Sequence, residues 1–280
     1  MAFRKYFYVL RIALSERLVY RTDFFLSTLM RFAPMVTTIL LWRAIYHVDE
    51  SPAAGSGGEP TRFDGLTYEN VVAYYLLTFV SRAFSSMPGL AGGIARDVRE
   101  GTIQKYLIQP IDQVYYLMMT RVAHKLVYYG VSAVPFAIAF YLLRGFFGGW
   151  PEPVMLAGGI ASLVLAFFLG FFFEVTIGMI SFWFLEISSL LFIVMSLNYF
   201  LSGHMVPLDL LPGGLRTVLE WLPFQYLAYF PAKMLLGTPD VTPAALGRGL
   251  ITQLGWVLLF IALSRFLYRR GLRRYSAFGG

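Results

Sequence analysis

The sequence predicts an all-α, polytopic membrane protein, and two features lead to this fold class. Hydrophobic residues make up 58% of the 280 positions and charged residues only 14%, whereas about 25% of the residues of a typical soluble domain are charged. Apolar stretches long enough for a helix that crosses a bilayer, about 20 residues, recur along the chain. We therefore expect one transmembrane domain over residues 1–280 with six membrane-spanning helices.

Residues 1–23 are expected to form a helix that lies in the membrane interface ahead of the first span. Basic residues there alternate with an apolar stripe at helical spacing, which consists of Phe3, Tyr6, Phe7, Leu10 and Leu14. This pattern is typical of an interfacial amphipathic helix. Because Arg17 and Arg21 interrupt the stripe, a cytoplasmic extension of the first span is the alternative.

The six spans are assigned to the apolar stretches between polar segments. They are residues 24–46, 66–90 and 117–143, two spans within the run 154–201, and residues 250–268. The run 154–201 is long enough for two crossings of about 20 residues each, and residues 181–189 are the expected turn between them. Met87-Pro88-Gly89 is expected to break the second span near its inner end.

The distribution of basic residues predicts the orientation in the cell membrane. Of the 23 Lys and Arg residues, 16 lie in segments that would face the cytoplasm and six in segments that would face outside. Because cytoplasmic loops carry the excess of Lys and Arg, we expect both termini in the cytoplasm. The net charge of +7 then reflects topology rather than nucleic-acid binding, since the basic residues do not gather in one soluble domain.

Two segments are expected on the outer side of the membrane. Residues 47–67 are expected to form an acidic loop. Residues 202–247 contain two short apolar helical candidates, 214–222 and 224–236, and neither is long enough to cross the bilayer. We expect a re-entrant or interfacial helical hairpin there, with candidate gate residues His204, Pro207, Pro212, Pro223 and Pro231.

The longest polar interruption on the cytoplasmic side is the segment 91–116, between the second and third spans. It carries both signs of charge around Gly101, a residue typical of helix C-caps and turns. The candidate contact residues for a partner are Arg96, Asp97, Arg99, Glu100, Gly101, Thr102 and Lys105. The residues alone leave two interpretations open, a short helix presented to a partner or a solvated loop with basic flanks.

Four charged residues, Arg31, Arg82, Glu174 and Glu186, lie within or near the predicted spans. An ionisable side chain at that depth is costly and is a functional hypothesis by default. For Arg31 the alternatives are snorkelling to the headgroups and contact with a protein partner. For Glu174 they are a functional role, an ion pair with Arg31 or Arg82, and solvation near the cytoplasmic end.

The sequence lacks the motifs of several enzyme classes. It contains no GxxxxGK[ST] phosphate loop, no HExxH and no GxSxG. Because cysteine is absent and the three histidines are scattered, we expect no metal site, no catalytic residue and no cofactor on this chain. The rival functions are an intramembrane enzyme that acts on lipids through Glu174, His204 and Asp209, and a passive channel or scaffold.

Short motifs and the order of the spans point to a known family. Residues 96–101, RDVREG, lead into residues 106–110, YLIQP; Phe182-Trp183 precedes Glu186 at the expected turn; and residues 202–237 contain Leu-Pro steps that close on Leu-Leu-Gly. Together these features resemble the permease subunit of type-2 ABC exporters, the ABC-2 family, and its small multidrug- or viologen-exporter-like branch.

The resemblance implies a function and partners. Residues 91–110 would be the coupling region, docked on a separate ABC-type ATP-binding subunit that binds ATP and Mg²⁺. A second permease chain, identical or a sister chain, would enclose a path lined by the first, second and fifth spans, in contact with membrane lipids. The implied function is export of an amphiphilic small molecule or a lipid-like substrate from the cytoplasm or the inner leaflet.

Overall fold

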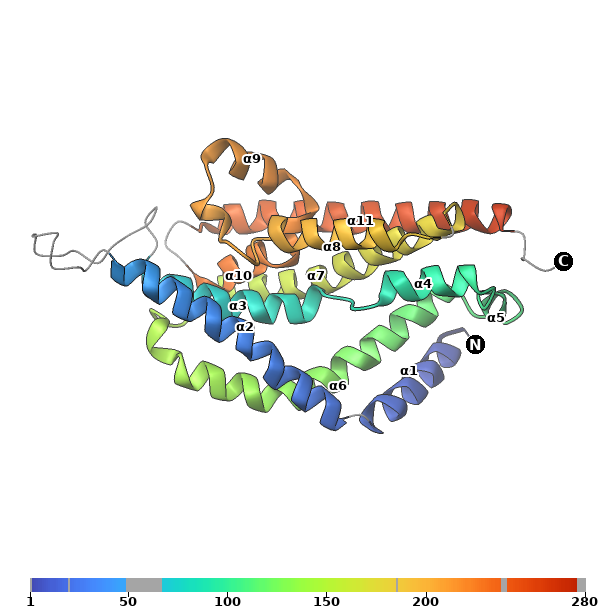
Figure 1. Ribbon diagram of the computed structural model, residues 1–280, viewed down its shortest axis with the longest axis horizontal. Coiled ribbons are helices and arrows are strands. Elements are labelled where there is room, and N and C mark those ends of the chain that lie inside the picture. Colours follow the sequence, from blue (N-terminus) through green and yellow to red (C-terminus); the bar gives the residue numbers. More distant parts are fainter. Residues whose placement is uncertain (1, 20, 49–66, 185, 238–240, 276–280) are drawn as a thin grey trace, which may run out of the picture.

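The computed structural model describes residues 2–19, 21–48, 67–184, 186–237 and 241–275. Every regular element in these ranges is helical (Figure 1), as the composition predicts. The acidic outer loop expected at residues 47–67 falls almost entirely outside the described residues, and its side of the membrane stays a prediction.

The helix bounds follow the sequence assignment closely. The α-helices are α1 (Ala2–Val19), α2 (Arg21–Val48), α3 (Tyr68–Ser85), α4 (Leu90–Arg99), α5 (Gln104–Leu107), α6 (Gln113–Leu142), α7 (Pro153–Met179), α8 (Ser188–Leu201), α9 (Gly213–Trp221), α10 (Tyr229–Leu236) and α11 (Pro243–Arg274). Four short 3-10 helices join them, namely η1 (Arg144–Phe146), η2 (Ile180–Phe182), η3 (Leu208–Leu210) and η4 (Pro223–Leu227). The turn expected at residues 181–189 therefore lies between α7 and α8.

Four of these helices are long and apolar enough to cross a membrane. They are the segments Phe25–Tyr46, Gln113–Leu142, Pro153–Phe182 and Pro243–Arg274. The expected second span is interrupted, since α3 ends at Ser85 and α4 begins at Leu90, and the expected fifth span, α8, has only 14 residues. The structure thus supports four spans by length, and the count of six stays a prediction.

Helix α7 lies at the centre of the fold. It packs against α3, α4, α10 and α11, whereas α1 and α2 pack against α6 on the other side of α3 and α4. In Figure 1, α3 and α4 run one after the other along the middle of the molecule, and α5 lies near both termini. The interrupted second segment, α3 and α4, therefore packs on α7 along both of its halves.

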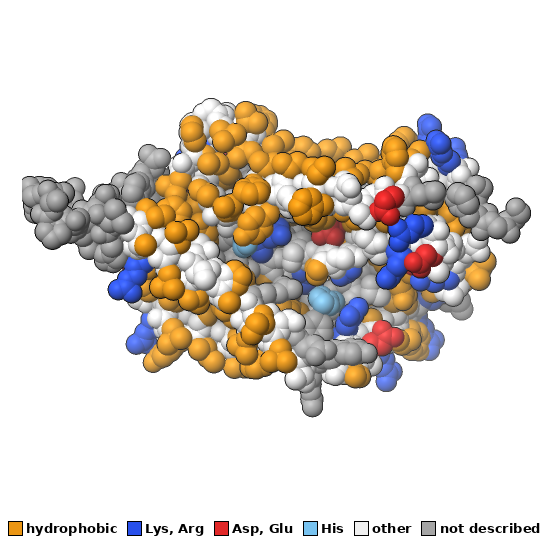
Figure 2. All heavy atoms as spheres, viewed as in Figure 1, with side chains coloured by type: hydrophobic (Ala, Val, Ile, Leu, Met, Phe, Trp, Pro, Cys, Tyr) orange, Lys and Arg blue, Asp and Glu red, His pale blue; other side chains and the backbone are white. Residues whose placement is uncertain are grey.

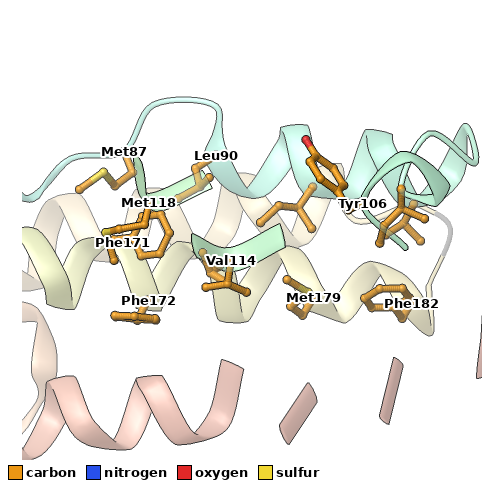
Figure 3. Close-up of a cluster of buried hydrophobic side chains, with 13 residues drawn as sticks. Met87, Leu90, Tyr106, Val114, Met118, Phe171, Phe172, Met179 and Phe182 are labelled. Atoms are coloured by element: carbon orange, nitrogen blue, oxygen red, sulfur yellow. The ribbon is translucent and has the colours of Figure 1, made fainter. Parts of the chain in front are cut away.

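The largest buried cluster joins α4 and α5 to the start of α6 and the second half of α7. Figure 3 shows Leu90, Tyr106, Val114, Met118 and other apolar side chains gathered between these helices. Leu90, Ile94 and Val98 of α4 are buried, so α4 uses one face to pack on α7. The polar segment 91–116 is therefore not a free loop, because its first half is a docked helix.

Two glycines of α7 let α3 and α4 approach α7 closely. A Cβ on Gly170 would collide with the carbonyl oxygen of Ser85, the last residue of α3, and a Cβ on Gly178 would lie 3.0 Å from Ile94 of α4. The contact at Gly170 involves backbone, which cannot rotate away as a side chain can. Both halves of the interrupted segment are thus pressed onto one helix.

The two short helices expected on the outer side are present as α9 and as η4 with α10. Helix α10 packs against α3 and α7 and its residues Tyr229, Phe230 and Ala232 are buried, whereas α9 buries only Leu219. The hairpin is therefore anchored through its second half, and its depth in a membrane stays a prediction.

We predict that Gly170→Ala destabilises the protein by about 1–3 kcal/mol, the usual cost of overpacking. The added methyl group must push α3 away from α7. The matched control is Gly255→Ala in α11, where a Cβ would meet nothing within 4 Å and alanine favours the helix. Thermal unfolding of the purified variants in detergent measures both, and equal melting temperatures would contradict the close contact.

Candidate functional site: an interrupted helix with charged caps

The break between α3 and α4 exposes helix ends inside the protein. Pro88 has no N–H to donate, and Gly89 adopts φ +71°, a conformation that glycine allows without strain. A helix end leaves backbone N–H or C=O groups without partners in the helix, and such groups are costly away from water. Side chains of α6 and α7 supply the missing partners.

Glu174 of α7 caps the beginning of α4. Its side chain is buried, and it accepts hydrogen bonds from the backbone N–H groups of Met87, at 3.3 Å, and of Ala91. A carboxylate at a helix N-terminus also meets the positive end of the helix dipole. Glu174 therefore bonds to backbone, with Arg121 and Arg82 as nearby positive charges.

Lys125 of α6 caps the end of α3. Its buried ammonium group donates to the carbonyl oxygens of Ala83 and, at 2.7 Å, Ser86. Tyr129 donates to the same Ala83 carbonyl at 3.1 Å, and Arg121 donates to the Pro88 carbonyl at 3.0 Å. A cation at a helix C-terminus complements the negative end of the dipole. Lys125 therefore suits the C-terminus of α3, as Glu174 suits the N-terminus of α4.

Sequence reasoning missed the role of Arg121 and Lys125, which lie in the predicted third span, residues 117–143. The signal was present in their spacing: residues four apart lie on one face of a helix, and α6 already begins at Gln113. Two cations on one face inside a helix that crosses the membrane predict buried partners.

The segment that joins α4 to α6, residues 99–112 and here called the tip, is compact. Gly101 adopts φ +77°, as expected for a turn glycine. Asp97 accepts from the Thr102 hydroxyl at 2.7 Å and pairs with Lys105 at 3.6 Å, and the side chain of Ile103 is fully buried. The tip is thus a formed element attached to the end of α4.

An exposed ion pair ties this tip to the turn between α7 and α8. Arg99 contacts Glu186 at 2.8 Å, and Glu186 also accepts from the Ser188 N–H at 2.9 Å. Hydrogen bonds from Ser188, then the charge of Arg99, lower the pKa of Glu186. The side chain of Glu186 is 62% exposed in this turn, and its place relative to the membrane stays a prediction.

The predicted contact residues divide into two groups. Arg96, Asp97 and Lys105 line a cavity of about 300 Å³ between α1, α4 and α6, whereas Arg99, Glu100 and Thr102 are exposed at the tip. Two apolar residues of the tip are exposed as well, Leu107 by 46% and Ile108 by 83%. Figure 2 shows charged side chains gathered at this end of a largely hydrophobic surface.

A second cavity, of about 740 Å³, lies between α2, α3, α6 and the segment around the end of α8. Its lining is mainly apolar and aromatic, including Trp42, Phe79 and Tyr199. Arg82 and His204 line it, and the described lining residues include no Asp or Glu. Arg31 lies in α2, but its side chain is outside the described part of the chain.

His204 is uncharged at neutral pH. Burial, with a smaller contribution from the charge of Arg82, lowers the pKa of His204 from 6.5 to about 4. Its ring lies edge-on to the Tyr199 ring, with centroids 4.8 Å apart. His204 therefore contributes a neutral aromatic side chain to the cavity wall.

The outer hairpin is held by one acidic residue. Asp209 pairs with Lys233 at 2.7 Å and Arg216 at 3.1 Å, and accepts from the Tyr229 hydroxyl at 2.8 Å. The four candidate prolines mark helix boundaries or the first turn of a helix: Pro207 precedes η3, Pro212 precedes α9, Pro223 begins η4 and Pro231 lies in α10. These prolines shape the hairpin.

The three residues of the rival enzyme do not form one site. Glu174 bonds to the backbone at the start of α4, His204 lies against Tyr199, and Asp209 binds Lys233 and Arg216. Among the described residues, no His, Asp or Glu group has the arrangement of a metal site.

Fold and site together define a helical membrane protein with an interrupted, charge-capped segment beside a cavity. The sequence model of the ABC-2 family transporter proteins matches residues 32–279. This chain therefore belongs to the ABC-2 transporter family, whose members are typically non-enzymatic transport components. A search of curated proteins finds no match.

We predict that Lys125→Met lowers the free energy of unfolding by about 1–3 kcal/mol, because it leaves buried carbonyl groups without donors. Lys5→Met, at an exposed position of α1, removes the same charge without this cost. Melting temperatures of the two variants in detergent should differ clearly. Equal values would show that Lys125 does not cap α3.

We predict that His204 makes the protein less stable in acid. Its folded pKa of about 4 lies below the value of 6.5 for a free histidine, so the unfolded chain takes up the proton first as the pH falls. Its stabilising effect is complete above pH 6.5 and is lost between pH 6.5 and 4, by about 2 kcal/mol at pH 5. His204→Phe should show a smaller drop in melting temperature between pH 7.5 and pH 5, and an equal drop would contradict the burial of His204.

Proposed function

We propose that this chain is the permease subunit of an ABC exporter and that a separate ATP-binding subunit drives it. The observation that carries the proposal is the cytoplasmic tip, which exposes Leu107 and Ile108 on a segment joined through α4 to the capped break. The family membership supports the permease role. The sequence contains no phosphate loop of the GxxxxGK[ST] type. The energy of ATP hydrolysis would therefore reach this chain through its contact with the ATP-binding subunit.

The tip has the properties of a docking surface. Exposed apolar anchors surrounded by charged groups are typical of protein interfaces, where the anchors supply affinity and the charges set the register. Ile108 and Leu107 would be the anchors, and Arg99 and Glu100 the surrounding charges. Arg96, Asp97 and Lys105, which were predicted as contacts, lie on the cavity side and would contribute less.

The packing offers a route from the tip to the cavity. Helix α4 is rigidly packed on α7 through Leu90, Ile94 and Val98. A push on the tip would therefore move α4 as a body, and the break at residues 86–89 would absorb the movement. Ser86 and Pro88 belong to the break and also line the larger cavity.

The larger cavity suits an amphiphilic cargo. Its aromatic and apolar wall would hold the apolar body, and Arg82 would favour a neutral or anionic polar group over a cationic one. The cavity is lined by α2, α3 and the end of α8, which are the first, second and fifth predicted spans. We propose that cargo enters from the cytoplasm or inner leaflet and leaves past the outer hairpin.

A second permease chain would complete the path. Helix α8 exposes Phe192, Ile193 and Phe200 by 75%, 55% and 56%, so this wall of the path is uncovered within one chain. A second copy or a sister chain placed there would close it.

We predict that Ile108→Asp abolishes association with the partner ATPase, because it removes the apolar anchor of the tip. The matched control is Gln109→Asp, an equally charged change at the next exposed position. The measurement is co-purification of an ABC-type ATP-binding subunit that is co-expressed with this chain, together with its ATPase rate in vesicles. Unchanged association of Ile108→Asp would refute the docking role of the tip.

The same experiment separates the rival functions. Charge reversal at Arg99 and Glu100 together should reduce stimulation of the ATPase while leaving membrane insertion intact. Transport without any nucleotide-binding chain would favour a passive channel, and turnover of lipid by the purified chain would favour an enzyme.

A further inference from the structure

The smaller cavity, between α1, α4 and α6, is strongly polar and has no part in the proposed path. Its charged lining residues are Arg17, Arg96, Lys105 and Arg121 on the basic side and Glu16 and Asp97 on the acidic side. Asp97 is already paired with Lys105 and Thr102. The remaining charge of the cavity is therefore positive.

Two arginines from different helices line this cavity, Arg17 of α1 and Arg121 of α6. Their like charges repel, while Glu174 offsets part of the charge of Arg121. Gathering cations in a partly enclosed space is unfavourable unless an anion joins them. Arginine is also the side chain best suited to a phosphate group, which it can contact through two N–H donors at once.

The cavity is a built site, because α1 is fixed over α6. The hydroxyl of Tyr6 accepts a hydrogen bond from the backbone N–H of Asp112 at 3.2 Å, and its ring lies 5.6 Å from that of Tyr115. Asp112 in turn pairs with Arg265 of α11 at 2.6 Å. These contacts hold Arg17 in place across from α4 and α6.

The predicted topology places the cavity at the headgroup level of the inner leaflet. Helix α1 has the sequence of an interfacial helix, and basic pockets beside transmembrane helices on the cytoplasmic side are where anionic headgroups bind. Gly89 and Leu90, at the break, also line the cavity. A ligand there would contact the start of α4 directly.

We propose that this cavity binds a phosphate group, supplied by an anionic phospholipid of the inner leaflet, and that the bound headgroup joins α1 to α4. Arg17, Arg96 and Arg121 are its ligands. The site is separate from the cargo cavity, so it stands even if the proposed export function fails.

The test compares two variants of α1 that each remove one positive charge. Arg17→Gln removes a cavity ligand, and Arg11→Gln removes an exposed arginine outside the cavity. The full chain is placed in nanodiscs of phosphatidylcholine and titrated with fluorescent phosphatidylglycerol. We expect apparent affinity to fall roughly tenfold for Arg17→Gln and to stay near the wild-type value for Arg11→Gln.

A second cavity variant controls for misfolding of Arg17→Gln. Arg96→Gln changes an exposed side chain on the opposite wall of the cavity and should also weaken binding. Equal melting temperatures in phosphatidylcholine alone would show that the variants are folded. If both cavity variants bind phosphatidylglycerol as tightly as the Arg11→Gln control, the proposal is wrong.

A further arm distinguishes the source of the phosphate. Inorganic phosphate is added to nanodiscs of phosphatidylcholine, and the melting temperature is measured with and without it. No effect of inorganic phosphate, with binding of the lipid, supports the lipid headgroup. An equal stabilisation that Arg17→Gln abolishes would assign the same site to free phosphate and overturn the lipid assignment.

Discussion

The structure depends on how the charges of α6 and α7 hold the two ends of an interrupted helix. Lys125 binds the carbonyl end of α3, and Glu174 binds the amide end of α4. Without these partners the break would leave several backbone groups unpaired among apolar side chains, which is costly. The two ends are thus capped from different helices, although α3 and α4 both pack on α7.

The two helices on either side of residues 86–89 share one support. Helix α4 with its tip is fixed on α7 by Gly178 and by the cluster around Leu90 and Ile94. Helix α3 also packs on α7, where Gly170 is pressed against Ser85, and it contacts α2 and α10 as well. Both helices therefore depend on α7, although their ends at the break are capped from different helices.

Much of the fold could be predicted from local signals. The turn after α7, the break at Met87-Pro88-Gly89, the turn at Gly101 and the two short outer helices follow from proline, glycine and the lengths of apolar runs. The caps could not be predicted this way, since Lys125 meets carbonyl groups about 40 positions earlier. The cavity that Arg96 and Lys105 line could not be predicted either, because it depends on where α1 docks.

The length of α8 has a consequence for the surrounding lipid. Its 14 residues extend about 21 Å as a helix, whereas the hydrocarbon core of a bilayer is about 30 Å thick. A membrane meets such a mismatch by thinning around the short element. Where α8 borders the bilayer, the two leaflets would therefore lie closer together than elsewhere, which shortens the distance that a polar headgroup must travel between them.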